Sequence, residues 1–158
     1  MCGRPPARAV CPIGFVKHLC PGVPHIPLKR VQPGKPFFLT SCDGKHTVEV
    51  LPFRVMHGQL PILGYRIGNM AWITDMLTVP EESYPLLEGL DCLIMNALRI
   101  EKHWTHQSLD EALKQAERIG AKETYFIHMS HQIGLHKQVN QDLPPHTHLA
   151  FDGMTWEI

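Results

Sequence analysis

The stretch Tyr125-Phe-Ile-His-Met-Ser-His131 decides the fold of this chain. It starts as an apolar strand pattern, runs into His128, and adds a second imidazole at His131. Two earlier strand-like runs also end in a polar donor, Arg54-Val-Met-His57 and Trp72-Ile-Thr-Asp75. Imidazole and carboxylate are the ligands that zinc, manganese and iron take from proteins, and strand ends hold such groups rigidly. The sequence therefore predicts that these donors meet at one edge of a sheet.

The composition is that of one soluble domain with a modest core, because 44% of the 158 residues are hydrophobic. The formal net charge is zero and no block of like charge occurs, so we expect neither a nucleic-acid partner nor an acidic membrane surface. The apolar runs are far shorter than the roughly 20 residues that cross a bilayer. Five cysteines without C-x-x-C spacing indicate free thiols and a reducing, cytoplasmic compartment.

The chain divides into three parts by pattern. Residues 1–20 are rich in proline and lack periodicity, so we expect an irregular, poorly ordered N-terminus followed by a domain over 21–158. The first half of that domain predicts antiparallel strands with a hairpin turn at Asp43-Gly44, namely 26–31, 36–40, 46–56, 62–67 and 71–74.

The second half alternates helices with strands. The capping box Ser108-Leu-Asp-Glu111 begins a helix that Gly120 ends. The remaining elements that we expect are helices over 80–88 and 135–143, and strands over 92–96, 123–128, 149–152 and 154–158. Strands that alternate with helices predict an α/β fold.

Five separate motifs occur along the chain in one order, namely Val55-Met-His-Gly-Gln-Leu-Pro-Ile-Leu-Gly-Tyr-Arg-Ile-Gly68, Trp72-Ile-Thr-Asp-Met76, Thr105-His-Gln-Ser-Leu-Asp-Glu-Ala-Leu113, Tyr125–His131 and Phe151-Asp-Gly-Met154. Together they resemble the C-terminal half of a metallo-β-lactamase-fold hydrolase, and more narrowly the branch of the phosphoribosyl cyclic phosphate phosphodiesterase. The resemblance implies an αββα sandwich of which this chain supplies one antiparallel or mixed sheet with helices on one face. The N-terminal half of that sandwich would be missing.

The resemblance also implies a role for each candidate residue. His57 matches a ligand of a first metal, Asp75 the carboxylate that bridges two metals, and His128 a ligand of the second metal. His106 and His131 match catalytic imidazoles that contact the substrate phosphate or the leaving group. The implied reaction is hydrolysis of a small cyclic phosphate diester by a metal-bound hydroxide, with two divalent ions, manganese or zinc, in an intact site.

One departure from the family pattern limits what this chain does alone. The sequence contains no His-x-His-x-Asp-His motif, which supplies most of the remaining metal ligands in the family. Each metal would keep one terminal ligand and half a bridge, where roughly four ligands are needed. We therefore expect a truncated, inactive fragment that holds metal weakly or not at all. Its exposed apolar sheet would need the missing N-terminal half or a second copy of the chain.

Other hypotheses remain open at this stage. Taken singly, His57 before a glycine reads as a turn residue, Asp75 as the start of a turn, and His128 as a core imidazole bonded to backbone. The chain could be a non-catalytic remnant that acts as a binding or assembly module, or a protein with a single metal on these three residues. The other histidines of the second half match no motif and are expected on the surface, namely His103, His136, His146 and His148.

Overall fold

The computed structural model describes residues 29–156, and the chain from Gln32 onward clusters as one compact unit. The expected irregular N-terminus and the domain boundary at residue 21 lie outside the described residues. So does the first half of the strand predicted over 26–31, and residues 29–31 are not in a strand.

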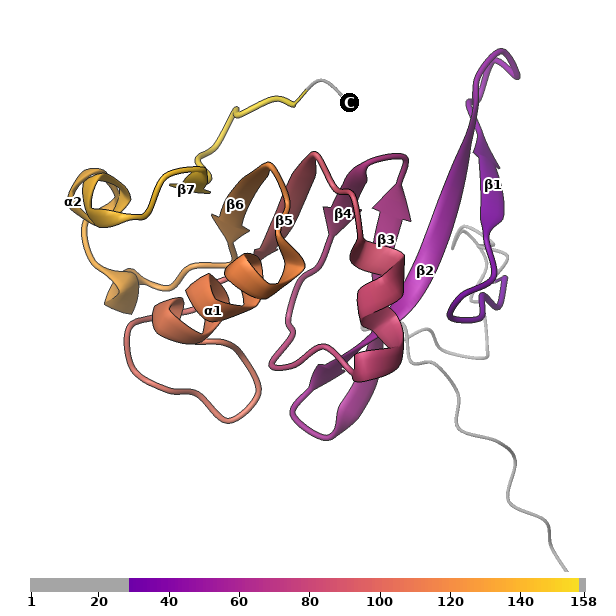
Figure 1. The fold of residues 1–158 in the computed structure, drawn as a ribbon. Coiled ribbons are helices and arrows are strands. Elements are labelled where there is room, and N and C mark those ends of the chain that lie inside the picture. The colour runs from indigo at the N-terminus through magenta and orange to yellow at the C-terminus, as the bar shows by residue number, and fades with distance from the viewer. Residues whose placement is uncertain (1–28, 157–158) are drawn as a thin grey trace, which may run out of the picture. The chain divides into compact units, whose positions relative to one another are not determined.

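Seven strands of the described chain form one mixed sheet, and they follow each other across it in sequence order (Figure 1). The first four pair antiparallel: β1 (Phe37–Thr40), β2 (Thr47–His57), β3 (Leu60–Ile67) and β4 (Met70–Trp72). The last three continue from β4 in parallel: β5 (Cys92–Asn96), β6 (Glu123–Ile127) and β7 (Thr147–Leu149). The α/β fold with a mixed sheet that the sequence predicts is thus confirmed.

Two helices cover one face of this sheet. In α1 (Leu109–Ile119), the Ser108 side chain accepts the N–H of Glu111 and the Glu111 side chain accepts the N–H of Ser108, as the capping box predicts. The helix ends at Gly120, whose φ of 70° is left-handed. The second, η1 (Glu81–Leu87), is a 3₁₀ helix and not the α-helix expected there, because Pro85 inside it has no N–H to donate.

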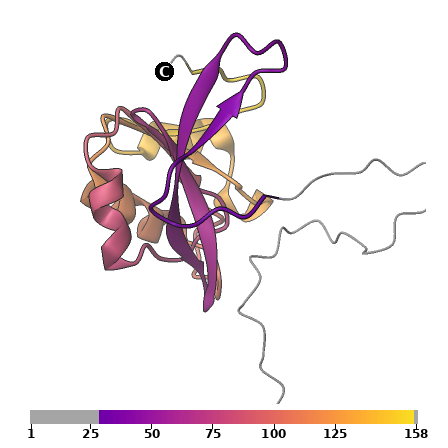
Figure 2. The same ribbon diagram turned by 90° about the vertical axis from the view of Figure 1, so that its right-hand side faces the viewer.

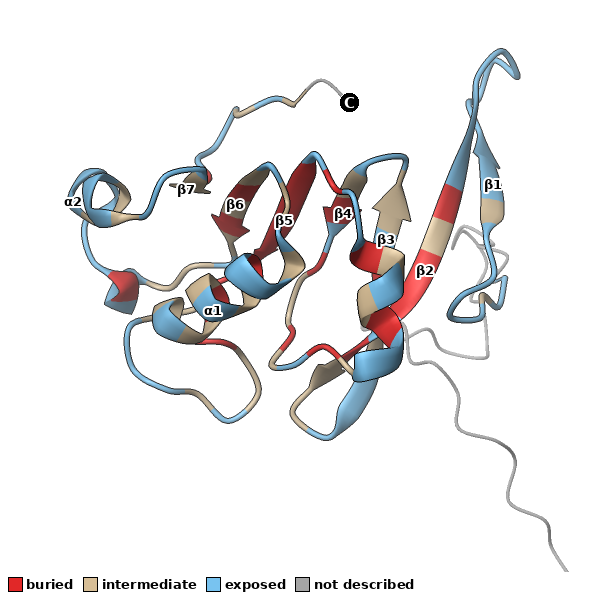
Figure 3. Cartoon of the chain, viewed as in Figure 1, coloured by how far each residue is buried: buried red, intermediate tan, exposed pale blue. Residues whose placement is uncertain are grey.

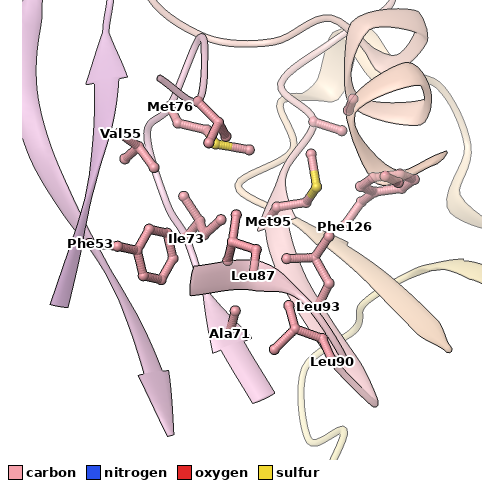
Figure 4. Packing of buried hydrophobic residues seen from close by; sticks show 14 of the residues in the cluster. Phe53, Val55, Ala71, Ile73, Met76, Leu87, Leu90, Leu93, Met95 and Phe126 are labelled. Carbon is pink, nitrogen blue, oxygen red and sulfur yellow. The ribbon is translucent and has the colours of Figure 1, made fainter. Parts of the chain in front are cut away.

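The core lies between the sheet and these two helices (Figures 1 and 2). Alternate residues of β2 point into it, so Phe53 and Val55 are buried while Arg54 between them is exposed. Figure 4 shows Phe53 beside Ile73, and Leu93 of β5 belongs to the same cluster. All five residues of β5 are buried, and the buried segments concentrate on the central strands (Figure 3). The buried central strands therefore hold the side chains at their ends in fixed positions.

The C-terminal segment differs from its prediction. The strand expected over 149–152 is instead β7, because the Leu149 N–H is taken by the Asn140 side chain and Phe151 begins a turn. Residues 154–156 are not in a strand, and 157–158 lie outside the described residues. Two short helices complete the fold, η2 (His131–Ile133) and α2 (His136–Asp142). No helix within residues 29–156 has both the length and the hydropathy to cross a membrane.

Candidate metal centre

Four of the predicted site residues lie at strand ends or in a loop at one edge of the sheet. β4, β5 and β6 are parallel, and β2 shares their direction because β3 runs antiparallel to both β2 and β4. His57 is the last residue of β2, Asp75 follows β4, and His128 follows β6 directly. His106 lies in the loop between β5 and α1. The carboxyl ends of parallel strands are where α/β sheets place their sites.

The Asp75 carboxylate stands at the centre of this group. Its Oδ1 lies 3.0 Å from Nε2 of His128 and 3.4 Å from Nε2 of His106. One ligand atom from each of the three residues lies within 4.8 Å of the other two. The rings of His106 and His128 stack with centroids 5.1 Å apart and planes 15° apart. Folding thus brings together three donors that are up to 53 positions apart in the chain.

The two remaining candidates are placed differently. The His57 ring meets the His106 ring edge-on, with centroids 4.7 Å apart, so His57 borders the group of three donors. His131 is exposed in the first turn of η2 and is not one of the three. The structure therefore gathers four of the five predicted residues, and His131 lies three positions beyond His128.

Two of the donors have a strained backbone. Asp75 and His128 have φ angles of 57° and 58°, in the left-handed region that L-residues avoid. Aspartate and histidine are among the residues that tolerate this region best, whereas an ordinary L-residue such as alanine would pay about 1–2 kcal/mol there. Strain of this kind concentrates at functional sites, where neighbouring structure enforces a geometry that the chain would not adopt by itself.

A chain of polar atoms runs from His106 away from Asp75. Thr105 donates its backbone N–H to Nδ1 of His103 at 3.4 Å, which makes that nitrogen an acceptor. Nδ1 of His106 lies 3.2 Å from the same nitrogen and 2.9 Å from Oγ1 of Thr105. A proton on Nδ1 of His106 would satisfy both neighbours, and this tautomer would leave the lone pair of Nε2 available to a cation beside the Asp75 oxygen.

His103 is a residue that sequence reasoning missed. It was expected at the surface, but it is only partly exposed and its ring contacts His106 with centroids 5.1 Å apart. Its spacing of three from His106 could have signalled the contact. Burial lowers the pKa of His106, although its hydrogen bond with Asp75 opposes the shift. The lowered pKa favours the neutral ring, which is the form that binds metals.

The donor set fits a divalent transition metal. Two ligand atoms that each lie about 2.1 Å from one tetrahedral ion are about 3.4 Å apart, and in octahedral geometry about 3.0 Å apart. The two distances from Asp75 Oδ1 fall within this range. In the tautomer of His106 that is protonated on Nδ1, the lone pairs of Nε2 and of the Asp75 oxygen would face each other, and a shared cation would remove their repulsion. Within residues 29–156 the group offers three donors, one fewer than a closed tetrahedral site.

Comparison with known proteins gives the family. Residues 2–129 match the model of the beta-lactamase superfamily domain. The chain is 41% identical over 141 residues to a Porphyromonas gingivalis protein described as an octanoyltransferase, covering 89% of this chain but 27% of that protein. A solved diphosphatase of the PhnP family is 38% identical with a TM-score of 0.75, over 82% of this chain and 48% of that one.

Two more distant structures share the fold alone. The metallo-β-lactamase-fold protein YhfI from Bacillus subtilis is 19% identical with a TM-score of 0.58, over 80% of this chain and 54% of that one. The short form of human tRNase Z is 22% identical with a TM-score of 0.54, over 75% of this chain and 44% of that one. The chain spans about half the length of these solved structures and about a quarter of the curated relative. It belongs to the beta-lactamase superfamily domain family and has a metallo-β-lactamase-type hydrolase fold.

Proposed function

We propose that this chain contributes Asp75, His106 and His128 to the divalent-metal centre of a hydrolase that acts on a small phosphate diester. The observation that carries the proposal is the Asp75 oxygen placed 3.0 Å and 3.4 Å from two imidazole nitrogens at one sheet edge. The 38% identical diphosphatase of the PhnP family supports phosphate chemistry. A cyclic phosphate diester remains our preferred substrate, as the motifs of the sequence suggest.

Each residue has a separate task in this proposal. When bound, a divalent cation would lower the pKa of a coordinated water and neutralise charge on the phosphate oxygens. Asp75 would hold it through Oδ1 and His128 through Nε2. We assign Nε2 of His106 to the same cation in place of its expected contact with substrate, because it lies within 4.8 Å of the other two donors.

The outer histidines complete the assignment. His57 borders the group through its contact with His106 and would serve a second cation at the end of β2. His131 is exposed in the first turn of η2 and would donate a proton to the leaving oxygen of the substrate, a task for which an imidazole is suited.

We further propose that this chain by itself has little turnover. Two cations need about four ligands each, and the described residues gather three donors and one neighbouring imidazole. The chain covers 48% of the length of the related diphosphatase, which leaves room in that protein for further donors. A partner segment that carries a His-x-His-x-Asp-His motif would complete the centre.

Metal analysis combined with an activity assay tests the proposal. The purified chain is loaded with Mn²⁺ or Zn²⁺, desalted and analysed for metal, and its hydrolysis of a chromogenic phosphate diester is followed. We expect about one equivalent of metal and little hydrolysis. The variant His128→Asn should lose the metal, since asparagine tolerates the left-handed backbone but lacks the imidazole donor.

The matched control is His46→Asn, which changes an exposed histidine in the turn between β1 and β2. Its metal content should equal that of the wild type. Two equivalents of metal with full turnover would show that the chain is competent alone. No metal in the wild type, under conditions where the protein is folded, would refute the metal centre.

A second candidate function, an assembly module without catalysis, is favoured by one observation. Tyr65 and Trp72 are paired across β3 and β4, and they are 36% and 39% exposed. Aromatic side chains of this exposure on one sheet face are typical of interaction surfaces. A metal-free chain whose sedimentation coefficient rises with concentration would support this function over the first.

A further inference from the structure

The peptide group of Met76 is a junction beneath the candidate centre. Met76 follows Asp75 directly, and its N–H donates to Oδ1 of Asn96 at 2.9 Å. Its carbonyl accepts from Nδ2 of Asn96 at 3.0 Å and from the backbone N–H of Gln107 at 3.2 Å. Gln107 follows His106 directly. One peptide therefore links the segment that carries Asp75 to the segment that carries His106.

Asn96 makes this junction from inside the protein. It is the last residue of β5 and is fully buried, with 0% of its surface exposed. Its orientation is fixed, because only the amide oxygen can accept the Met76 N–H and only the amide nitrogen can donate to the Met76 carbonyl. A buried amide is costly unless both of its ends are bonded, and here both ends are bonded to the same residue.

The junction explains how the left-handed backbone of Asp75 is maintained. The φ of 57° at Asp75 is unfavourable by itself, so the surrounding structure must enforce it. The two hydrogen bonds with Asn96 fix the N–H and the carbonyl of Met76, the residue after Asp75. They thereby fix the direction in which the Asp75 side chain projects from the backbone. Asn96 is on β5, which pairs with β4 before Asp75 on one side and with β6 before His128 on the other. Its register partner on β6 is Ile127, the residue before His128.

We propose that Asn96 is a positioning residue that holds the Asp75 carboxylate, and through the Met76 carbonyl the His106 loop, at the separation that a cation requires. The inference rests on the proposed metal centre for its function. It assigns Asn96 no contact with metal or substrate. Supporting groups of this kind typically change metal affinity about 10–100-fold when they are removed.

The test replaces Asn96 by leucine, which has a similar volume and neither hydrogen bond. The matched control is Ile94→Ala, because Ile94 is fully buried on the same strand and the same face, two residues earlier. Calorimetric titration with Mn²⁺ or Zn²⁺ should show a Kd about 10–100-fold weaker for Asn96→Leu. The control should lower the melting temperature at least as much and leave the Kd within about twofold of the wild type.

A double-mutant cycle separates positioning from stability. If Asn96 acts through Asp75, adding Asn96→Leu to Asp75→Asn should weaken metal binding no further, whereas the losses of melting temperature should still add. Additive losses of affinity, or an equal loss of affinity in Ile94→Ala, would overturn the proposal. Should Asn96→Leu fail to fold, Asn96→Asp keeps the side-chain shape and the acceptor, and it is expected to give an intermediate Kd.

A metal-free measurement makes the outcome independent of the proposed function. In the wild type, the backbone couplings and the strong intraresidue N–H to Hα contact of Asp75 in NMR spectra should report its positive φ. In Asn96→Leu these signals should move toward ordinary negative φ values, and in Ile94→Ala they should not. Unchanged signals in Asn96→Leu would refute the role of Asn96 even if metal binds. Absence of metal binding with the expected NMR change would refute only the metal centre.

Discussion

Replacing Asp75 by asparagine removes the central donor and leaves the fold in place. Asparagine keeps the shape of aspartate and populates the left-handed backbone, so the φ of 57° costs nothing new. Asp75 is also 46% exposed, so its charge contributes little to folding through its imidazole neighbours. We expect the free energy of unfolding to change by less than about 0.5 kcal/mol in metal-free buffer.

Metal affinity should respond very differently to the same change. The amide oxygen is neutral, and Asp75 Oδ1 is the atom that faces both Nε2 atoms of the neighbouring histidines. Outer groups cost about 10–100-fold when they are lost, so loss of a charged ligand should cost more than about 100-fold. A factor of 100 corresponds to about 2.7 kcal/mol of binding free energy.

Asp75→Ala provides the contrast in stability. Alanine in the left-handed region costs about 1–2 kcal/mol, so this variant should lose metal and also melt about 3–10 °C lower. Asp91→Asn is the control for the loss of a carboxylate. Asp91 pairs with Lys122 at 2.7 Å at the start of β5, away from the donors, and its removal should leave the Kd unchanged.

Calorimetric titration and thermal melts in the presence of a chelator measure the two quantities separately. Metal binding by Asp75→Asn within about threefold of the wild type would refute the ligand role of Asp75. Equal melting temperatures of Asp75→Asn and Asp75→Ala would show that residue 75 lacks the left-handed backbone in solution.

Three further predictions concern the scaffold. In Gly64→Ala the new Cβ would lie 2.6 Å from the buried ring of Phe53, so we expect a loss of about 1–3 kcal/mol in urea unfolding, and no loss would contradict this packing. Ser108→Ala removes the acceptor for the Glu111 N–H at the start of α1, and it should cost about 1 kcal/mol and lower the helical circular dichroism on heating. Glu123 has its pKa lowered by hydrogen bonds from two histidines, so its contribution to stability is present above the unfolded pKa near 4.5 and is lost as pH falls through the lower folded value. Glu123→Gln should therefore flatten the loss of stability measured between about pH 5 and pH 3, and an unchanged slope would argue against these bonds.

Local signals were the most reliable part of the sequence. The strand predicted over 92–96 is β5 to the residue, because a short apolar run between turns can only be buried. The helix α1 begins and ends where its capping box and Gly120 predict, since caps satisfy backbone groups within one turn. The strand predicted over 149–152 lies instead over Thr147–Leu149. The Leu149 N–H donates to the Asn140 side chain of α2, a contact with a separate helix that the local sequence does not reveal.

The candidate site was only partly visible in the sequence. The motifs pointed to His57, Asp75, His106 and His128, and the structure brings these four together, while their roles stay predictions. His131 was assigned by the same motifs and remains apart from the three donors. The supporting roles of His103, Thr105 and Asn96 were not anticipated. The spacing of three between His103 and His106 is the one local signal, and nothing in the local sequence distinguishes Asn96 from any other residue of a buried strand.

The sequence by itself determined the order of the strands and helices between β1 and α2, the caps of α1 and the family. All of these depend on patterns within a few residues or on motifs in a fixed order. Only the tertiary structure decided that the Asp75 oxygen lies 3.0 Å from one imidazole and 3.4 Å from another, and that Asn96 ties the two loops together. The physical reason is that such distances depend on the register of parallel strands and on a left-handed backbone, which long-range packing enforces against local preference.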